Sequence, residues 1–424
     1  FDMTYFNYKR NQLYCEKVSL KKLCDTVQTP FYVYSSNRII DNYKILSNSL
    51  RKTDCLIAFA VKANSNISIL RTLAKCGAGA DVVSYGELKK AMVAGINPNK
   101  IVFSGVGKKP SEIKEAIDAK ILQFNIESFD ELETVASIAK EKNMLANIAL
   151  RVNPDVKAGG HPKISTGKKT DKFGIAMSKS IKAYNFAKDN PYLNVVGVDL
   201  HIGSQILNIN PFKKAFNRLI KFTLELERAG HNIKNVDLGG GIGINYQSKP
   251  NNKLIRQYLD LIKNTYTKLN KKIIIEPGRF LVADSGILVT KVIYKKSNEN
   301  KKFVIIDAGM NDFMRPALYS AKHQIKALIQ GKDKLKENTY DVVGPICETS
   351  DTMAESISLS REIKKGDYLF IDKVGAYGSV MSSNYNTRET IQEILVKDKD
   401  YETIKNKIKV EQLISQEKMA SWLK

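Results

Sequence analysis

Cysteine and histidine are scarce in this chain of 424 residues, which holds five cysteines and four histidines. The cysteines are scattered, odd in number and form no CxxC pair, which argues against a disulfide framework and suits a reducing compartment. The histidines lack an HExxH motif or any other paired spacing, so we predict no metal site. They are His161, His201, His231 and His323.

Long apolar runs are absent as well. No run approaches the roughly 18 residues that a membrane span needs. The opening residues, FDMTYFNYKRNQLYCEK, lack the apolar core of a secretory signal peptide. We therefore expect a cytoplasmic protein that acts away from membranes.

Acidic residues are fewer than basic ones, since the chain has 44 Asp and Glu but 67 Lys and Arg. The net charge is therefore +23. A nucleic-acid-binding protein would carry such a charge. Here, however, the lysines are spread along the chain, as in NTYTKLNKKI and YKKSNENKKF, and no nucleic-acid-binding motif accompanies them. We expect a lysine-rich, solvated surface that helps to attract an anionic ligand, and no nucleic-acid partner.

An alternation of short apolar runs with segments of helical period extends from residue 36 to residue 284. Several helical segments, such as SILRTLAKCG and YGELKKAMVAG, stop at glycine. A (β/α)8 barrel is closed by eight strands that alternate with helices, which is the number of strands expected here. The eight expected strands are LIAFAV, AGADVV, KIVFS, ILQFNI, LANIALRV, NVVGVDLHI, NVDLGGG and KIIIEPG.

An open, doubly wound sheet is the alternative architecture. It would carry a G-x-G-x-x-G/A fingerprint after a strand. Three candidates fail at its last position, where GAGADV has Val82, GVGKKP has Pro110 and GGGIGI has Ile244. We therefore predict an α/β fold with an N-terminal (β/α)8 TIM-like barrel.

The sequence pattern changes after residue 285, where strand-like runs such as KKFVIIDAG and DYLFIDKVGAY are separated by turns. This predicts a C-terminal, mainly-β domain, as expected for a chain longer than a single core usually serves. The first residues also look strand-like, so we assign residues 1–35 and 285–424 to this domain and residues 36–284 to the barrel. Residues 401–424 predict a basic amphipathic helix that packs on the β domain.

Polar residues and glycines recur at the ends of the expected strands. In a (β/α)8 barrel the chemistry lies at the carboxyl ends of the strands. A lone polar residue there is usually only packed and hydrogen-bonded, but seven strands that bring such residues to one rim predict an active site. These residues are Lys62, Asp81, Ser104, Arg151, His201, Gly239, Gly240, Gly241, Glu276 and Arg279.

Three of these features together describe a pyridoxal phosphate (PLP) site. A partly desolvated Lys62 would be a usable amine nucleophile for a Schiff base with a carbonyl compound. The glycines at 239–241 can present backbone N–H groups to a phosphate, and Glu276 could hold a proton on a pyridine nitrogen. Taken singly, Lys62 could instead form a structural ion pair with Asp81, and the glycines could be a tight strand–helix turn.

Five motifs resemble the alanine-racemase-fold PLP decarboxylases, in order and over essentially the whole chain. They are FAVKAN (59–64), HIGSQ (201–205), GGGIG (239–243), EPGR (276–279) and GPICETSD (344–351). Within that family, the segments ISTGKKTDKFGI (164–175), DAGMNDFMRPALY (307–319) and CETSD are similar to those of diaminopimelate decarboxylases. The resemblance implies an N-terminal barrel, a C-terminal β domain and PLP as the cofactor.

Roles for individual residues follow from this resemblance. It implies that Lys62 holds PLP covalently, that His201 stacks on its ring and that Glu276 pairs with its nitrogen. Cys347 would donate a proton, which makes Lys62, Cys347 and His201 the expected catalytic residues. The other cofactor-binding residues would be Asp81, Ser204, Gly239, Gly240, Gly241, Pro277, Gly278, Arg279 and Tyr377. The substrate-binding residues would be Arg279, Arg315, Tyr319, Glu348 and Tyr377.

The resemblance also implies the reaction and the assembly. The expected activity is decarboxylation of meso-2,6-diaminopimelate to L-lysine and CO2, the last step of lysine biosynthesis. Cys347 and Glu348 would reach the partner subunit's active site, which implies a homodimer with shared sites. Rival interpretations are a decarboxylase for ornithine, arginine or a carboxylated polyamine, and a catalytically inactive regulator. Arg315 could also be a surface ion-pair residue.

Overall fold

The chain folds into two units in this computed structural model, which describes residues 5–157, 159, 171–248, 250–331, 338–359 and 363–423. One unit, here called the barrel, comprises residues 40–245 and 249–281. The other, here called the β domain, comprises the chain up to Ile39, residues 246–248 and residues 282–424. His161 and most of the segment 164–175 lie outside the described residues.

Eight parallel strands close the barrel in the order β5, β6, β7, β8, β9, β11, β12, β13 and back to β5. Each coincides with one of the eight strands expected from the sequence, so the predicted TIM-like barrel is confirmed. A short extra strand, β10 (Ile175–Ala176), pairs with β9. The strands are β5 (Cys55–Ala60), β6 (Gly79–Val82), β7 (Ile101–Phe103), β8 (Gln123–Ile126), β9 (Ala146–Asn153), β11 (Leu193–Asp199), β12 (Asn235–Asp237) and β13 (Lys272–Ile275).

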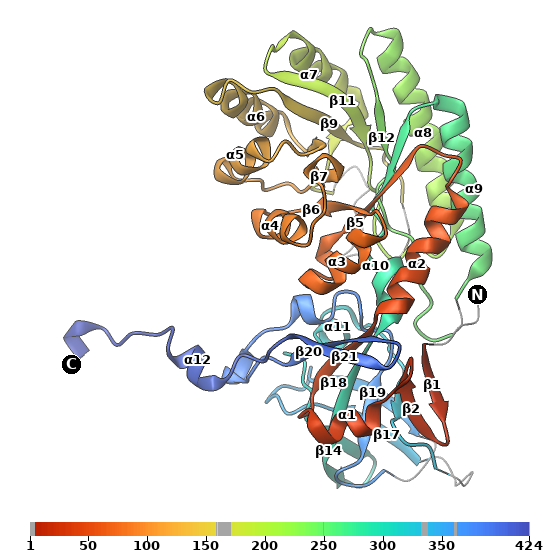
Figure 1. Cartoon of the computed structure of the whole chain (residues 1–424), viewed down its shortest axis with the longest axis vertical. Helices are drawn as coiled ribbons and strands as arrows, with labels where there is room; N and C mark the ends of the chain where they lie inside the picture. Colours follow the sequence, from red (N-terminus) through yellow and green to blue (C-terminus); the bar gives the residue numbers. More distant parts are fainter. Residues whose placement is uncertain are drawn as a thin grey trace. The chain divides into compact units, whose positions relative to one another are not determined.

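Helices follow the barrel strands and cover their outer side (Figure 1). Local signals set their ends: Ser84 and Ser128 cap α4 and α6 by accepting main-chain N–H groups. Gly77, Gly95 and Gly230 end α3, α4 and α8 with positive φ angles, a conformation that favours glycine. The helices are α2 (Ser36–Ser49), α3 (Ile67–Lys75), α4 (Tyr85–Val93), α5 (Pro110–Asp118), α6 (Phe129–Glu141), α7 (Met177–Asp189), α8 (Ile209–Arg228), α9 (Asn252–Leu269) and α10 (Arg279–Val282), with η1 (Val61–Ala63) and η2 (Pro98–Lys100) as 3₁₀ turns.

The β domain contains strands from both ends of the chain. β4 (Phe31–Ser35) lies between β14 (Gly286–Ser297) and β20 (Gln392–Lys397), antiparallel to the first and parallel to the second. Its side chains Phe31 and Val33 pack into a core with Ile287 and Ile394. The other strands are β1 (Phe6–Lys9), β2 (Gln12–Cys15), β3 (Val18–Ser19), β15 (Lys302–Ile306), β16 (Ile325–Ala327), β17 (Asn338–Val343), β18 (Thr352–Leu359), β19 (Tyr368–Ile371) and β21 (Asp400–Lys405).

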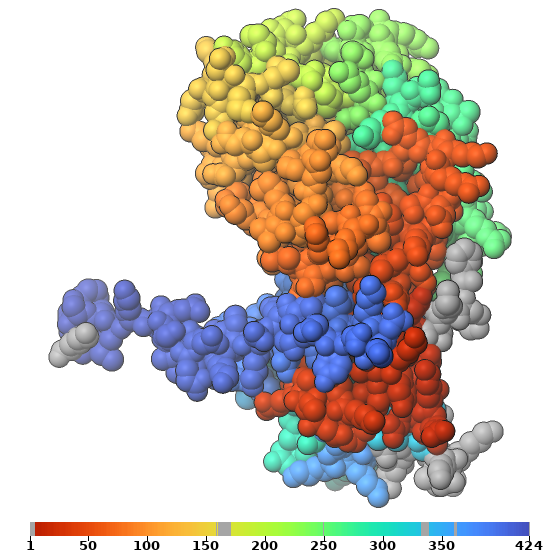
Figure 2. Space-filling view, in the orientation of Figure 1, coloured from red at the N-terminus to blue at the C-terminus, as the bar shows by residue number. Residues whose placement is uncertain are grey.

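Short helices and the end of the chain complete this unit. The expected helix over residues 401–424 is wrong, because β21 occupies its beginning and only α12 (Val410–Ile414) is α-helical. Several large apolar side chains of this stretch, including Ile414 and Trp422, are exposed, so a longer helix would not have its apolar face packed. Figure 2 shows the stretch, in dark blue, with its atoms at the surface. The remaining elements are α1 (Leu20–Thr26), α11 (Arg315–Tyr319), η4 (Ala283–Ser285), η5 (Ser379–Met381), η6 (Tyr385–Thr387) and η7 (Ser421–Leu423).

Within the described ranges, no helix combines the length and the apolar character that crossing a membrane requires.

Candidate active site

Lys62 lies at the carboxyl end of the first barrel strand, in the turn η1 that follows β5. Its Nζ donates to Oδ2 of Asp81 at 2.9 Å, and Asp81 is in β6, paired directly with Ala60. Lys62 and Asp81 therefore form the ion pair that the sequence left open as an alternative. This ion pair does not make the Lys62 amine inaccessible to a ligand, because the Lys62 side chain is 34% exposed whereas Asp81 is fully buried. Asp81 holds the amine at the rim, where a ligand can reach it.

In the glycine run after β12, Gly239 to Gly241, the main chain packs directly against the main chain of neighbouring strand ends. The N–H of Gly239 donates to Asp237 Oδ1 at 3.0 Å, and its carbonyl accepts from the N–H of Glu276 at 2.9 Å. A Cβ on Gly239 would lie 2.4 Å from the Leu200 carbonyl oxygen, and a Cβ on Gly240 would lie 2.1 Å from the Glu276 carbonyl oxygen. Because both neighbours are backbone atoms, only glycine lets the ends of β11, β12 and β13 approach so closely.

A Gly240→Ala variant is expected to lose about 1–3 kcal/mol of unfolding free energy, because its new methyl group would displace the backbone at Glu276. Chemical denaturation of the wild-type and variant chains measures the difference. Gly107→Ala is the matched control, since nothing lies within 4 Å of a Cβ built on Gly107. Equal unfolding midpoints for the two variants would contradict the role assigned to Gly240.

Glu276 follows β13 and heads a group of buried carboxyl groups. Its Oε1 accepts long hydrogen bonds, of 3.4 Å each, from Ser104 Oγ and Asn125 Nδ2. Carboxylate oxygens of Glu276, Asp199 and Asp237 lie within 4.8 Å of one another. Burial first, and then the charges of neighbouring carboxylates, raise the pKa of Glu276 well above its usual value.

The two neighbours of Glu276 are shifted in the same direction. Burial raises the pKa of Asp237 to about 7 and raises that of Asp199 well above its usual value. Like charges this close cannot all be ionised in a buried site, so the group retains protons at neutral pH. A cation or a protonated nitrogen brought to Glu276 would lower the pKa of this carboxyl group and favour its ionised form.

His201 lies two residues beyond β11 and is a neutral ring. Burial, followed by the nearby charges of Arg151 and Lys62, lowers its pKa well below the usual value. Its Nδ1 accepts from the N–H of Gly203 at 3.1 Å, which places the ring proton on Nε2. An uncharged imidazole held in this way offers a flat face to an aromatic ligand.

Arg151 has a structural partner of its own. It lies inside β9, two residues before the strand ends, and its Nη1 donates to Glu127 Oε1 at 2.6 Å. The same carboxylate accepts from the N–H groups of Gly105 and Gly174. Glu127, paired with Arg151, thus joins the segments that follow β7, β8 and β9, and the charge of Arg151 lowers the pKa of His201.

The EPGR segment connects the rim residues. The carbonyl of Pro277 accepts from the N–H of Ala60 at 3.3 Å, so the segment runs beside the turn that carries Lys62. A Cβ on Gly278 would lie 3.0 Å from that of Ala63, a tight contact that a larger residue could make only if the turn at Lys62 shifted slightly. Arg279 Nη2 donates to Ser204 Oγ at 3.1 Å and so links the ends of β13 and β11. These contacts bring all the barrel residues predicted for the site to one rim.

This rim fits PLP chemically. The reachable amine of Lys62 suits the aldehyde, and the glycine run with Ser204 and Arg279 offers donors to a phosphate. Glu276 suits the pyridine nitrogen, and His201 suits the ring face. One oxygen of Asp81, Oδ1, is buried and has no hydrogen-bond partner among the described residues, as expected where a bound group completes a site.

Arg315, the first residue of α11 in the β domain, is held by stacking and by a histidine. It is 6% exposed, so the alternative of a surface ion pair is wrong. Its Nε donates to His323 Nε2 at 3.3 Å, and its guanidinium lies 5.1 Å from the ring centre of Tyr246 and 5.9 Å from that of Tyr319. His323 Nδ1 lies 2.9 Å from the Asp372 carbonyl oxygen, which fixes the tautomer that accepts from Arg315.

Cys347 and Glu348 lie on the connection between β17 and β18, and both are exposed. Tyr377 is half-buried with a positive φ of 55°, in a turn whose Gly375 and Gly378 leave no room for a Cβ beside the Val282 and Val374 carbonyl groups. The β domain thus carries the remaining predicted residues, each in a defined local setting. Their roles stay predictions.

Four buried polar residues at the ends of the barrel strands were not predicted. They lie in a barrel strand or directly after one, and the rule used for Lys62 would have found Glu127 after ILQFNI and Asp199 and Asp237 at the ends of β11 and β12. Their positions within apolar runs concealed them. The residues are Asn125, Glu127, Asp199 and Asp237.

Comparisons with known proteins agree with this site. Residues 36–283 match a family model described as the pyridoxal-binding domain of pyridoxal-dependent decarboxylases. The diaminopimelate decarboxylase of Helicobacter pylori strain J99 is 43% identical over 393 residues, which make up 93% of this chain and 96% of that protein. That of Aquifex aeolicus is 42% identical over 403 residues, 95% of each chain.

Solved structures give the same result. The diaminopimelate decarboxylase of M. jannaschii in complex with L-lysine has a TM-score of 0.93 at 37% identity, covering 99% of this chain and 98% of that one. The Helicobacter pylori enzyme with L-lysine has a TM-score of 0.90 at 42% identity, covering 94% and 98%. The chain therefore belongs to the pyridoxal-dependent decarboxylases and, within them, to the diaminopimelate decarboxylases.

Proposed function

We propose that this chain decarboxylates meso-2,6-diaminopimelate to L-lysine and CO2 with PLP as its cofactor. The observation that carries the proposal is the meeting of Lys62, the glycine run and Glu276 at one barrel rim. We keep residues 36–284 as the proposed cofactor-binding domain. The identity to diaminopimelate decarboxylases over nearly the whole chain supports the choice of substrate.

Each barrel residue has a defined task in this reaction. When bound, PLP supplies the electron sink for the pair left behind as the bond between Cα and the carboxylate breaks. Lys62 would hold the cofactor through its amine, and Glu276 would hold the proton on the pyridine nitrogen. His201, neutral and oriented by Gly203, would support the ring face. Cys347 would deliver a proton to Cα after CO2 has left.

The substrate carries an amino acid group at each end, so its distal end presents one carboxylate and one ammonium. Arg279 and Arg315 with the phenol of Tyr319 would bind the distal carboxylate, and Glu348 would bind the ammonium. Arg315 suits this role because packing orients its planar guanidinium before any ligand arrives. Ornithine and arginine end in a cation alone and would offer these arginines no distal carboxylate to bind.

A homodimer is part of the proposal. Cys347 and Glu348 are exposed in a single chain, whereas a group that donates a proton to a carbanion must work shielded from water. A second subunit would supply the missing cover and place both residues in its own barrel site. The described cysteines are free thiols, which supports placing the enzyme in the cytoplasm.

The test of the proposed function is CO2 release from meso-2,6-diaminopimelate by the purified full chain, with and without added PLP. Release that depends on PLP is expected, and ornithine, arginine and L-lysine should each give less than a hundredth of that rate, as an order-of-magnitude expectation. No release from the diaminopimelate, or faster release from one of the others, would refute the proposed substrate.

A Cys347→Ala variant is expected to bind PLP normally and to lose about 10²- to 10⁴-fold in kcat, the usual contribution of a positioned proton donor. The absorbance of bound cofactor and the rate of CO2 release measure the two effects. Cys76→Ala removes a thiol at the end of α3 and should leave both unchanged. An unaltered rate in Cys347→Ala would exclude this thiol as the donor.

A further inference from the structure

Two hydroxyl groups of the β domain hold the carboxylate of Glu348. The phenol of Tyr385 donates to Oε1 at 2.5 Å, and the hydroxyl of Ser350 donates to Oε2 at 2.9 Å. The hydrogen bond from Tyr385, and to a smaller extent the one from Ser350, lowers the pKa of Glu348. The side chain is therefore a carboxylate at neutral pH. Each oxygen has one donor and keeps lone pairs for another. The plane of the carboxylate is thereby set while its capacity to accept remains.

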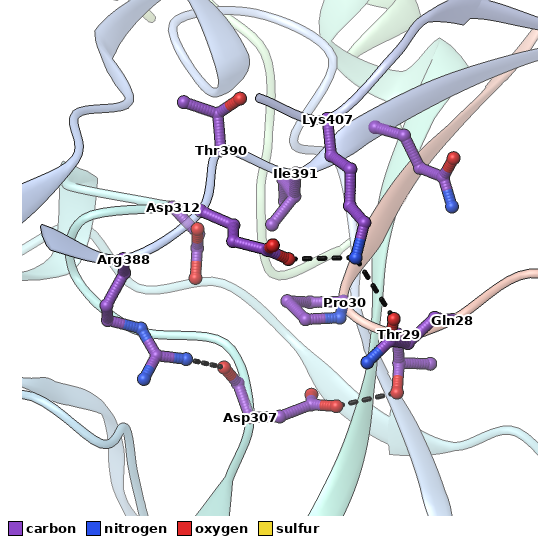
Figure 3. A pocket seen from close by; sticks show the side chains of 11 residues that line it. Gln28, Thr29, Pro30, Asp307, Asp312, Arg388, Thr390, Ile391 and Lys407 are labelled. Carbon is purple, nitrogen blue, oxygen red and sulfur yellow. Dashed lines mark hydrogen bonds and ion pairs between the residues drawn. The ribbon is translucent and has the colours of Figure 1, made fainter. Parts of the chain in front are cut away.

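The segment that carries Tyr385 is anchored on both sides of this residue, at Ser383 and at Arg388. Tyr385 opens the turn η6, and the next residue after that turn, Arg388, donates from Nη2 to the Asp307 carbonyl oxygen at 3.1 Å (Figure 3). The N–H of Ser383 donates to the Asn311 carbonyl oxygen at 2.8 Å. Both anchors lie on the segment 307–319, which ends in the residues proposed to bind the distal carboxylate.

The segment that carries Glu348 is anchored to the same place. Asp351 accepts from the N–H of Met310 through Oδ1 and from the N–H of Ile346 through Oδ2, each at 2.7 Å. A Cβ on Gly344 would lie 2.4 Å from Asp351 Oδ2, so the turn closes tightly over this carboxylate. The segments 344–351, 379–388 and 307–319 are thus tied together within the β domain.

We propose that Tyr385 is a positioning residue that sets substrate specificity: with Ser350, it orients the Glu348 carboxylate to receive the ammonium of the substrate's distal end. The inference rests on the proposed function, since it takes Glu348 as the group that recognises this ammonium. An exposed glutamate otherwise rotates freely and loses that freedom when it binds a ligand. Because the hydrogen bond from Tyr385 already restricts the Glu348 side chain before the ligand binds, less conformational entropy is lost on binding. Tyr385 thereby strengthens binding of the ammonium and takes no part in decarboxylation.

The test compares Tyr385→Phe with wild type as full-length holoenzymes. KM for meso-2,6-diaminopimelate should rise about 3- to 10-fold, with kcat changed less than about twofold, because one hydrogen bond to an exposed carboxylate is lost. Ser350→Ala should act in the same direction, and Glu348→Gln should raise KM further. Tyr401→Phe is the control, because Tyr401 is similarly exposed on β21 and lies outside the three tied segments.

Two inhibitors separate ammonium recognition from general distortion. L-lysine keeps the ammonium and carboxylate of the distal end, whereas 6-aminohexanoate lacks that ammonium. In Tyr385→Phe the inhibition constant of L-lysine should rise by the same factor as KM, and that of 6-aminohexanoate should stay within about twofold of wild type. An equal rise for both inhibitors would show distortion of the site and overturn the inference.

The outcomes also separate the inference from the proposed function. If wild type releases no CO2 from the diaminopimelate, the proposed function fails. If wild type is active and Glu348→Gln raises KM while Tyr385→Phe does not, the function stands and the role of Tyr385 is refuted. If neither variant changes KM, Glu348 does not recognise the ammonium and the inference is refuted with the activity intact.

Discussion

A Lys62→Ala variant is expected to lose the absorbance of covalently held PLP and to turn over at least about 10³-fold more slowly than wild type. The reason is chemical: alanine removes the amine that lies at the rim beside Asp81, next to the turn against which the EPGR segment runs. Absorbance spectra of the purified holoenzyme and CO2 release measure the two losses. A surviving chromophore would show that the cofactor is held elsewhere.

Lys62→Arg is the matched control for stability. In Lys62→Ala the buried carboxylate of Asp81 loses its cation, so the cofactor-free variant should unfold at a lower temperature than wild type. Arginine can keep an ion pair with Asp81 but cannot replace the amine chemistry of lysine. Lys62→Arg should therefore be as inactive as Lys62→Ala while unfolding closer to wild type.

Mixing the inactive variants Lys62→Ala and Cys347→Ala tests the shared active site. If the sites combine Lys62 of one subunit with Cys347 of the other, a mixed dimer contains one intact site. Unfolding and refolding the two variants together should then restore up to about a quarter of the wild-type rate. Failure to restore activity in demonstrated mixed dimers would place both residues in the same subunit's site.

A Glu276→Gln variant is expected to lose at least about 10²-fold in kcat, yet to be more stable than wild type at alkaline pH when both are free of cofactor. Glutamine cannot accept the proton of a pyridinium nitrogen as a carboxylate does, so the electron sink is weakened. In the cofactor-free chain, however, glutamine removes a buried negative charge that lies beside Asp237, Asp81 and Asp199.

The direction of the pH effect follows from the raised pKa of Glu276. Between its usual pKa, 4.5, and its raised pKa, the folded chain binds more protons at this site than the unfolded chain does. Unfolding free energy of wild type therefore falls as pH rises through this window. The advantage of Glu276→Gln should grow from pH 5 to pH 9 in thermal unfolding, while Glu133→Gln, at an exposed position of α6, should show no such trend. An advantage independent of pH would contradict the buried charge.

The barrel and its rim were predictable because they follow from local patterns. Alternating apolar runs and helical segments located all eight strands, and the rule that chemistry lies at the strand ends selected Lys62, His201 and Glu276. Asp237 also lies at a strand end and satisfies this rule, but it was not selected because a carboxyl group inside an apolar run looks like an ordinary strand residue. Only the closed barrel shows that it lies against Glu276 and holds the N–H of Gly239.

The end of the chain was predicted wrongly for a physical reason. Residues 401–424 have the composition of an amphipathic helix, but a short helix is stable only when its apolar face is packed. Part of this segment instead pairs with β20 as β21, and several large apolar side chains beyond it, such as Ile414 and Trp422, are exposed. Composition cannot say which surface is available to a segment.

The sequence by itself determined the fold class, the cofactor chemistry and the family, because each depends on residue types at short, fixed spacings. Tertiary structure alone decided the electrostatics and the orientation of side chains. The raised pKa of Glu276 depends on burial and on carboxylates from three other strands, and the hydrogen bond from Tyr385 to Glu348 joins residues 37 positions apart. Electric fields and hydrogen bonds act through space, so they become visible only when the folded chain brings distant residues together.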